Sequence, residues 1–430
     1  MGRVRRLPLR GADLVLLAMH ARWARAGASS NTMMVVECDG PVDAGRFRRA
    51  LDRLLDVCPW PAARLRRRLP WGPLHWAAPP RSRLAPPPVL ERRPADGDAV
   101  HRVLEAELND AIDGRREAPL RLVVAGRVLV VTWFHPLMDP RGGQNLLAHL
   151  ARIDAATPDS PWREPPEAFV APRDGRPLRE RGRLARRSLA HMRRLAGATV
   201  VSPGTGVAAF GAARFLQQGF DVPATPGGDA RATREISWRL AVVGRAMADL
   251  WRRRSLPGEP FLLPISVDLR PRGEPGPTIG NMLAFHFARF SPAETDDVPA
   301  LARALRQRMA DAVRDGLVDA NAVAMDFLRY RPVRLMMTAV PWAAGGETFS
   351  FNCADISDFP PDLDRLLGRR VLNAYHVPAV LPRPGIGVFF NRCGGRSNVV
   401  VSWVEGAVND DEAQRVMAMV AGGLGWTAAS

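Results

Sequence analysis

Hydrophobic positions along the chain alternate between short apolar runs, typical of strands, and residues spaced three or four apart, typical of helices. In the first half the pattern predicts strands at 31–39, 120–124 and 128–133 and helices at 7–27, 42–57 and 98–112. In the second half it predicts strands at 213–222, 261–267, 282–290, 348–352, 385–390 and 399–404 and helices at 231–252, 298–315 and 410–424. Both halves therefore mix strands and helices, which predicts two α/β sandwiches of similar size.

A proline-rich segment separates the two halves. Residues 155–180 contain six prolines and interrupt the pattern, which is typical of a linker. A helix with apolar residues among many arginines is predicted at 178–195. A chain of 430 residues exceeds what one core usually holds, so we expect a first domain at 1–165, a linker and basic helix at 166–199, and a second domain at 200–430.

The net charge of +16 comes from arginine alone, because the chain contains no lysine. Total absence of lysine beside abundant alanine and proline indicates a G+C-rich bacterial genome, so part of the arginine excess reflects codon usage. A basic surface still attracts anions such as phosphate-bearing cofactors, acidic carrier proteins and anionic lipids. We expect no nucleic acid partner, since RNA-binding motifs and zinc-finger spacings are absent from the sequence. The helix at 178–195 either packs on the protein body or makes peripheral contact with a membrane.

Localisation follows from what the sequence lacks. No apolar run is long enough for a spanning helix or a secretory signal. The four cysteines lie far apart without C-x-x-C spacing. We therefore expect a cytoplasmic protein with reduced thiols and no metal site.

A histidine at the end of the strand at 128–133 is the first candidate for chemistry. His135 is followed four residues later by Asp139, and Gly142 and Gly143 then open a helix. A strand end can hold the histidine backbone still while its imidazole projects into a cleft. Taken alone, the pattern favours an ordinary strand-end histidine and an aspartate in the turn or at the cap of the next helix.

Further motifs follow in a recognisable order along nearly the whole chain. They are LPLRGAD near the start, HPLMDPRGG at His135, SPWREPP in the linker, LLPISVDLRP and TIGN with Arg270, Gly280 and Asn281, TFSFN ending at Asn352, and GVFFNRCGGRSNVVVSWVEGAVNDDEAQRV near the end. In this order they resemble the CoA-dependent acyltransferase superfamily. Its members include wax ester synthase/diacylglycerol acyltransferases, nonribosomal peptide condensation domains, plant BAHD acyltransferases and chloramphenicol acetyltransferase.

The resemblance implies a fold of two chloramphenicol-acetyltransferase-like subdomains, arranged as a V-shaped pseudo-dimer with a central cleft or tunnel. It implies that His135 is the general base that moves an acyl group from an acyl-CoA or phosphopantetheinyl carrier thioester to a small alcohol or amine. No permanently bound cofactor is expected, and Asp139 would pair with Arg270 to shape the loop. Candidates for the substrate channel are Phe134, Pro140, Gly142, Gly143, Asn281 and Asn352.

Two residues depart from the family pattern. Condensation and wax ester enzymes usually carry His-His-x-x-x-Asp-Gly, whereas this chain has Phe134 for the first histidine and Pro140 for the glycine. BAHD enzymes work with the second histidine alone, and proline suits the first position of a helix. Proline also removes a backbone N–H and fixes φ. The alternative is therefore a catalytically inactive relative that serves as a binding or scaffold protein for a carrier protein or partner enzyme.

Overall fold

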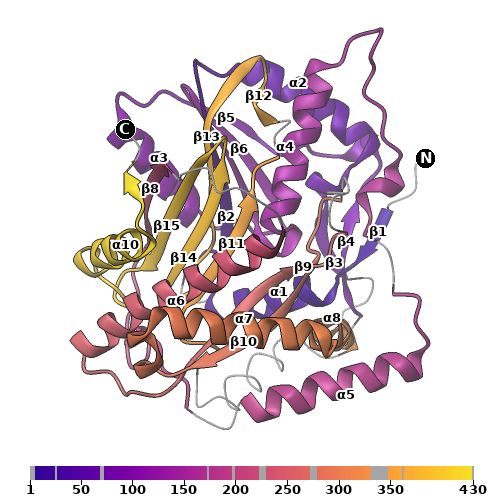
Figure 1. The fold of residues 1–430 in the computed structure, drawn as a ribbon. Coiled ribbons are helices and arrows are strands. Elements are labelled where there is room, and N and C mark those ends of the chain that lie inside the picture. Colours follow the sequence, from indigo (N-terminus) through magenta and orange to yellow (C-terminus); the bar gives the residue numbers. More distant parts are fainter. Residues whose placement is uncertain are drawn as a thin grey trace.

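The computed structural model describes residues 5–24, 27–67, 72–171, 174–195, 199–221, 229–271, 278–330, 347–360 and 363–428. Two main sheets, a strand pair and a small sheet are flanked by helices (Figure 1). None of the helices within these ranges has the length and apolar character that crossing a membrane requires.

The first main sheet has six strands in the order β12-β13-β2-β7-β6-β5. Their bounds are Asn31–Cys38 (β2), Val89–Arg92 (β5), Leu120–Ala125 (β6), Val128–Phe134 (β7), Arg365–Leu366 (β12) and Arg369–Val377 (β13). The predicted hairpin of β6 and β7 forms, with Gly126 at a φ of +63° in its turn. Neighbouring strands are antiparallel except β5 and β6, which are parallel.

Alternate residues of this sheet face two different layers, because side chains of a strand point to opposite faces in turn. On one face Met34 and Val36 of β2 share a core with the helices Ala44–Val57 (α2) and Pro140–Ala155 (α4). On the other face Met33 and Val35 pack with the helix Gly97–Asn109 (α3) and with the second sheet. Burial on both faces explains why β2 and β7 are apolar almost throughout.

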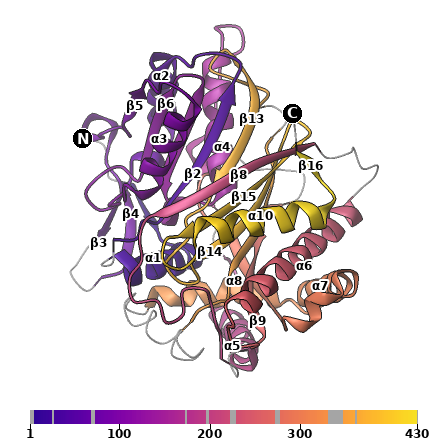
Figure 2. The same cartoon turned by 90° about the vertical axis from the view of Figure 1, so that its left-hand side faces the viewer.

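The second main sheet has the order β11-β14-β15-β8-β16. Its strands are Ala213–Asp221 (β8), Asn352–Asp358 (β11), Ile386–Cys393 (β14), Arg396–Val404 (β15) and Thr427–Ala428 (β16). The helices Asp229–Arg253 (α6) and Asp410–Leu424 (α10) contact this sheet and each other, and Figure 2 shows α10 lying across β15 and β8. The helix Val298–Arg314 (α7) packs on α6.

A separate strand pair, Phe261–Asp268 (β9) and Leu283–Phe290 (β10), lies beside the helix Leu317–Asp326 (α8). The helix Gly11–Trp23 (α1) packs on α8, so the start of the chain contacts the second half. The small sheet joins Arg5–Pro8 (β1), Leu74–Ala78 (β4) and Arg64–Arg67 (β3) in that order.

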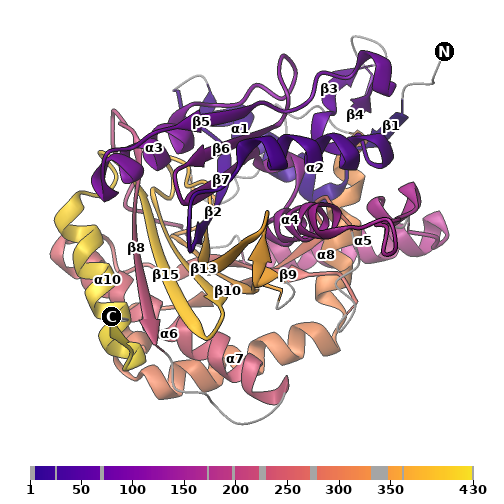
Figure 3. The ribbon, with the colours of Figure 1, turned by 90° about the horizontal axis from the view of Figure 1, so that it is seen from above.

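The two halves share strands and core. β13 comes from the second half of the chain but pairs with β2 in the first sheet, and it packs against β14 and β15 (Figure 3). Tyr375 of β13 joins Val35, Phe389 and Val400 in one core that both main sheets line. The division at residues 165 and 200 stays a prediction, and a strand from beyond it completes the first sheet.

The predicted basic helix forms as Leu178–Leu195 (α5) and packs on α8. Arg181 on this helix pairs with Asp174 and with Asp326 of α8. Leu178 and Leu189 are 68% and 51% exposed, so part of the apolar surface of α5 faces solvent. Membrane contact by this helix stays a prediction.

Several elements differ from the sequence prediction. The strand expected at 348–352 instead begins at Asn352 and runs to Asp358, and β13, β1, β3, β4, β5 and α8 were not predicted. In β13 the polar Asn373 and His376 interrupt the apolar run that marks a buried strand. Both are buried because polar partners meet them: Asn398 bonds the Asn373 amide, and the Asn391 side chain accepts the His376 N–H.

Candidate active site

His135 stands directly after β7, at the start of a 3₁₀ turn, His135–Leu137. Its backbone N–H donates to the Ser30 carbonyl at 3.0 Å. The Trp133 indole N–H donates to the Met138 carbonyl at 2.8 Å, which holds the far side of the turn. The sheet and the indole together fix the histidine backbone, as expected for a strand-end residue.

His135 as a whole residue is half-buried. Burial lowers its pKa below the usual 6.5, and the carbonyls of His135 and Met138 and the charge of Asp139 oppose this shift without reversing it. Nδ1 is buried and has no hydrogen-bond partner among the residues the structure describes. The ring is therefore neutral at pH 7, which is the form that can accept a proton.

Asp139 is fully buried at the start of α4 and accepts four hydrogen bonds. One oxygen takes the Gly142 N–H at 2.7 Å and an Arg270 N–H at 3.0 Å. The other takes the second Arg270 nitrogen at 3.0 Å and the Met282 N–H at 2.8 Å. Asp139 therefore caps α4 and also pairs with Arg270. Its two interpretations, as a helix cap and as the partner of Arg270, are compatible.

Arg270 extends this pairing to the second half of the chain. Its guanidinium also donates to Asp268 and to the Gly280 carbonyl, both at 3.0 Å. Burial lowers the pKa of Arg270, but Asp139 and Asp268 raise it more, so its net pKa is above the usual value. Arg270 therefore stays charged, and its bonds to Asp139 hold the His135 turn against the strand pair β9–β10.

Gly142 and Gly280 bring two backbone segments into close contact. A Cβ on Gly142 would lie 2.9 Å from the Gly280 oxygen and 3.0 Å from Met138 Cβ. Gly280 has a φ of +152°, a conformation that residues with side chains rarely adopt. Neither neighbour can move far, because Asp139 and Arg270 hold both segments.

Gly142→Ala is expected to cost about 1–3 kcal/mol of unfolding free energy through this overpacking. Gly422→Ala is the matched control, since Gly422 lies in α10 with no atom within 4 Å of its added Cβ. That control is expected to gain about 0.5–1 kcal/mol from helix propensity. Urea unfolding of both variants checks this, and equal effects in the two would show that the contact at Gly142 carries no strain.

Asn281 reaches the His135 turn from the other side. Its side-chain nitrogen lies 3.3 Å from the His135 carbonyl and 3.2 Å from the Pro136 carbonyl. The same nitrogen donates to Asp13 of α1 at 2.8 Å. Asp13 was not singled out by its sequence, although it belongs to the LPLRGAD motif.

The other predicted channel residues lie in different surroundings. Phe134 is 2% exposed and its ring packs edge-on against His20 with centroids 4.9 Å apart. Gly143 lies against the Trp133 ring, and Pro140 occupies the first turn of α4. Asn352 opens β11 opposite Gly387 in the second sheet. The structure therefore brings His135, Asp139, Arg270, Gly142 and Asn281 together, and it places Phe134 and Gly143 in apolar packing.

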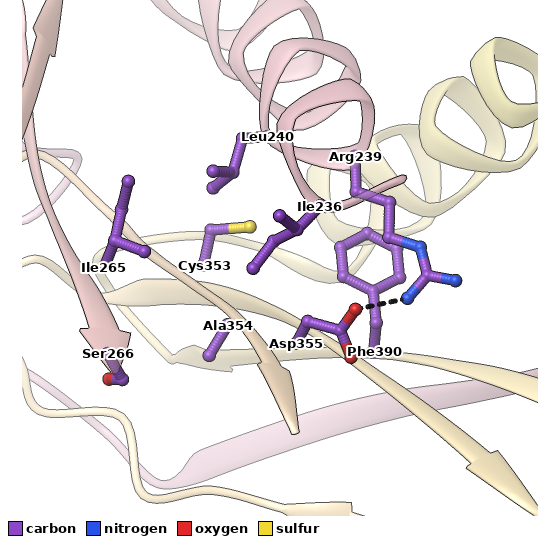
Figure 4. Close-up of a pocket in the computed structure, with 9 residues that line it drawn as sticks. All are labelled: Ile236, Arg239, Leu240, Ile265, Ser266, Cys353, Ala354, Asp355 and Phe390. Atoms are coloured by element: carbon purple, nitrogen blue, oxygen red, sulfur yellow. Dashed lines mark hydrogen bonds and ion pairs between the residues drawn. The ribbon is translucent and has the colours of Figure 1, made fainter. Parts of the chain in front are cut away.

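A small cavity lies in the second half, between α6, β9 and β11 (Figure 4). Arg239 and Asp355 form an ion pair of 2.6 Å at its edge, and Cys353 and Phe390 line it. About 10 Å³ of it is open to a water-sized sphere, which is close to the minimum for one water molecule. His135 does not line this cavity, so the cavity is separate from the predicted substrate channel. The channel itself stays a prediction.

Across the described ranges, no three His, Cys, Asp or Glu side chains are grouped so as to hold a metal ion.

No family model matches the sequence, and no curated protein matches it either. Solved structures do match over nearly the whole chain. A trichothecene 15-O-acetyltransferase from Fusarium sporotrichioides has a TM-score of 0.68 at 10% identity, with 98% of this chain and 95% of that chain covered. The first condensation domain of the calcium-dependent antibiotic synthetase has a TM-score of 0.65 at 13% identity, with 99% of both chains covered.

The protein has the condensation and chloramphenicol-acetyltransferase fold. The fold class predicted from the sequence is confirmed, and so is its resemblance to this superfamily at the level of the fold. Polyketide synthase associated protein 5 from Mycobacterium tuberculosis has the fold too, with a TM-score of 0.59 at 16% identity and 97% of both chains covered. Identities this low show a shared fold.

Proposed function

We propose that the protein transfers an acyl group from a thioester, carried by CoA or by the phosphopantetheine arm of a carrier protein, to an alcohol or amine. The observation that carries the proposal is the state of His135. It is a half-buried residue with a neutral imidazole, on a turn that Asp139, Arg270 and Asn281 hold from three sides. A general base needs this combination of an available lone pair and a fixed position.

The proposed reaction needs no covalent enzyme intermediate. Nε2 of His135 accepts the proton of the acceptor O–H or N–H while that oxygen or nitrogen attacks the thioester carbon. The tetrahedral intermediate then collapses, the C–S bond breaks, and the imidazolium returns its proton to the departing thiolate. We assign the base to Nε2 because Nδ1 is buried.

Asp139 serves this reaction as a structural residue. Its four hydrogen bonds use both carboxylate oxygens on Gly142, Arg270 and Met282. A carboxylate engaged in this way shapes the loop and is not placed to take a proton from substrate. His135 is thus the base in the proposal, and the aspartate–arginine pair keeps its turn in one conformation.

The partners follow from the same proposal. The structural neighbours include condensation domains of peptide synthetases and a polyketide-synthase-associated protein, which agrees with a carrier protein as donor. CoA is the other donor class in the proposal, and a small alcohol or amine is the acceptor.

A single-turnover assay tests the function. The purified chain is mixed with short acyl donors on pantetheine, CoA and a loaded carrier protein, together with a panel of alcohols and amines, and both products are followed by intact mass. We expect loss of the thioester together with an equal amount of acylated acceptor. Donor binding without any acyl transfer across the panel would instead favour the binding or scaffold protein.

Pro140 bears on that alternative, because proline replaces the glycine of the family pattern. It occupies the first turn of α4 directly after its cap, Asp139, a position that proline suits. We expect Pro140→Gly to leave turnover within about threefold and to lower unfolding free energy by about 0.4–1 kcal/mol, because the unfolded chain gains freedom.

Pro299→Gly is the matched control, since Pro299 lies in the first turn of α7 after the cap Asp297 and away from His135. The two variants should lose similar stability in urea unfolding. Thioester turnover that appears in Pro140→Gly alone would mean that Pro140 blocks the site and that the natural chain is a binding protein.

A further inference from the structure

Helix α1 packs against the His135 turn. The first turn of α1 packs closely on α8. A Cβ on Gly11 would lie 2.4 Å from Met325 Cβ. The Gly11 N–H donates to the Asp326 side chain at 3.0 Å. Asp13 and His20 are seven residues apart, which places them two turns apart on one face of the helix. Both side chains contact residues that hold His135.

The first contact runs through Asn281. Asp13 is 4% exposed and accepts the Arg10 N–H at 2.7 Å and the Asn281 side-chain nitrogen at 2.8 Å. Three acceptors surround that nitrogen, namely Asp13 Oδ1 and the His135 and Pro136 carbonyls, while Asn281 Oδ1 has no partner within the described part of the chain. The amide can therefore take only one orientation, and its shortest bond, to Asp13, sets it.

The second contact runs through Ser30. His20 Nδ1 lies 3.0 Å from the Ser30 hydroxyl. The carbonyl of the same serine accepts the His135 N–H at 3.0 Å. Two side chains of α1 therefore contact the residues that bond the His135 backbone. His20 contacts Ser30, whose carbonyl accepts the His135 N–H. Asp13 contacts Asn281, whose amide nitrogen lies near the His135 carbonyl.

We propose that α1 is the positioning element of the site, in which Asp13 acts through Asn281 and His20 acts through Ser30 to hold the backbone of His135. The proposal rests on the function proposed above and assigns Asp13 and His20 as positioning residues. Neither touches the reacting atoms. Both act by setting where the His135 imidazole points.

The surroundings of Asp13 bear on its charge. Burial raises its pKa to about 7, and the charge of Asp139 adds to this, while the Arg10 N–H, Asn281 and the Arg10 side chain lower it. The titratable or charged residues His135, Asp326 and Arg329 also lie on elements that pack on α1. An ionised carboxylate is the better acceptor for the Asn281 amide, so the contact weakens as Asp13 takes up a proton.

Asp13→Asn separates positioning from helix capping. The amide oxygen of asparagine can still accept the Arg10 N–H, so the cap of α1 survives. Its NH₂ group then faces the NH₂ of Asn281, two donors meet, and the Asn281 amide must turn away from the His135 and Pro136 carbonyls. A residue that only caps the helix would tolerate this change.

We expect Asp13→Asn to lower kcat by about 10²-fold, the loss that a displacement of about 1 Å can cause, with KM within threefold. Glu412→Gln is the matched control, because Glu412 has the same capping role in α10, where it accepts the Asn409 N–H at 2.9 Å. That control should lose stability without losing kcat. His20→Phe, which keeps the ring contact with Phe134, should lower kcat less, since the Ser30 carbonyl still accepts the His135 N–H.

The double variant Asp13→Asn with Asn281→Asp restores a donor–acceptor pair between the two residues but turns a carboxylate toward the His135 carbonyl. Acceptors then face acceptors at the His135 and Pro136 carbonyls, so kcat should stay low although the contact between positions 13 and 281 is restored. Recovery of kcat together with stability would overturn the proposal, and so would an Asp13→Asn variant with unchanged kcat.

A readout without turnover distinguishes this proposal from the proposed function. The His135 ring resonance, assigned with His135→Ala in ¹³C-histidine-labelled protein, should shift or broaden in Asp13→Asn and stay in place in Glu412→Gln. If no donor is ever turned over but this shift is seen, the function fails and the positioning stands. If transfer is shown and His135 neither moves nor loses rate in Asp13→Asn, the positioning fails alone.

Discussion

Replacing His135 with alanine is expected to lower acyl-transfer turnover by about 10²–10⁴-fold, the usual contribution of a positioned general base. The substitution removes the proton acceptor and leaves in place the Asp139–Arg270 pair and the bonds from Asn281 to the carbonyls of the turn. The measurement is the single-turnover rate of thioester loss with a donor that the natural chain uses. His101→Ala is the matched control, because His101 lies on α3 with a side chain 45% exposed and faces Glu105.

The pH dependence of the natural chain should agree with the same assignment. Burial holds the pKa of His135 below 6.5, so the active neutral form dominates at pH 7. Turnover is therefore expected to fall first as Asp13 takes up a proton near pH 7, and to fall further as pH drops through the lowered pKa of His135. A rate that survives in His135→Ala, or an acid limb unchanged by that substitution, would remove His135 from the reaction.

Arg270→Met is expected to lower unfolding free energy by about 3–5 kcal/mol, the usual cost of removing one partner of a buried ion pair. Asp139 would keep its N–H bonds from Gly142 and Met282 but would lose its countercharge in a site where it is fully buried. The Gly280 carbonyl would lose its guanidinium donor as well. Turnover should fall too, because the His135 turn would no longer be tied to β9–β10.

Arg176→Met is the matched control for this experiment. Arg176 pairs with Asp174 and Asp319, but its side chain is 31% exposed, so we expect a loss of only about 0.2–1 kcal/mol. The double variant Asp139→Asn with Arg270→Met should recover part of the stability lost in Arg270→Met, because no unpaired charge stays buried. Guanidinium unfolding of all three variants provides the comparison, and equal losses in Arg270→Met and Arg176→Met would mean that the buried pair contributes little.

Elements with complete local signals were predicted from the sequence with their correct bounds. α10 runs from Asp410 to Leu424 as predicted, because Asn409 and Glu412 cap its start and Gly425 ends it at a φ of +64°. α5 was also placed correctly at Leu178–Leu195. The β6–β7 hairpin and the helix start after Asp139 belong to the same group, since a turn glycine and a capping aspartate act within a few residues.

Local sequence signals identified only part of the candidate site. His135 and Asp139 stand out through their position between a strand and a helix, but the partnership of Asp139 with Arg270 came from the family resemblance. Pattern alone cannot pair residues 131 positions apart. Phe134, Gly143 and Asn352 were grouped with the channel for the same reason, and the structure places the first two in packing around Trp133, His20 and the first core.

The sequence by itself therefore determined the local elements and the fold, and it singled out His135 as the candidate base. Tertiary structure decided which distant segments meet. β13 joins the first sheet because β2 offers it an open edge, despite polar residues that hide its strand character. Asp13 and Asn281 lie 268 positions apart, and neither has a local signal that points to the other. Helical and strand periods act over a few residues, whereas contacts around His135 depend on how whole layers pack, so only the folded chain brings them together.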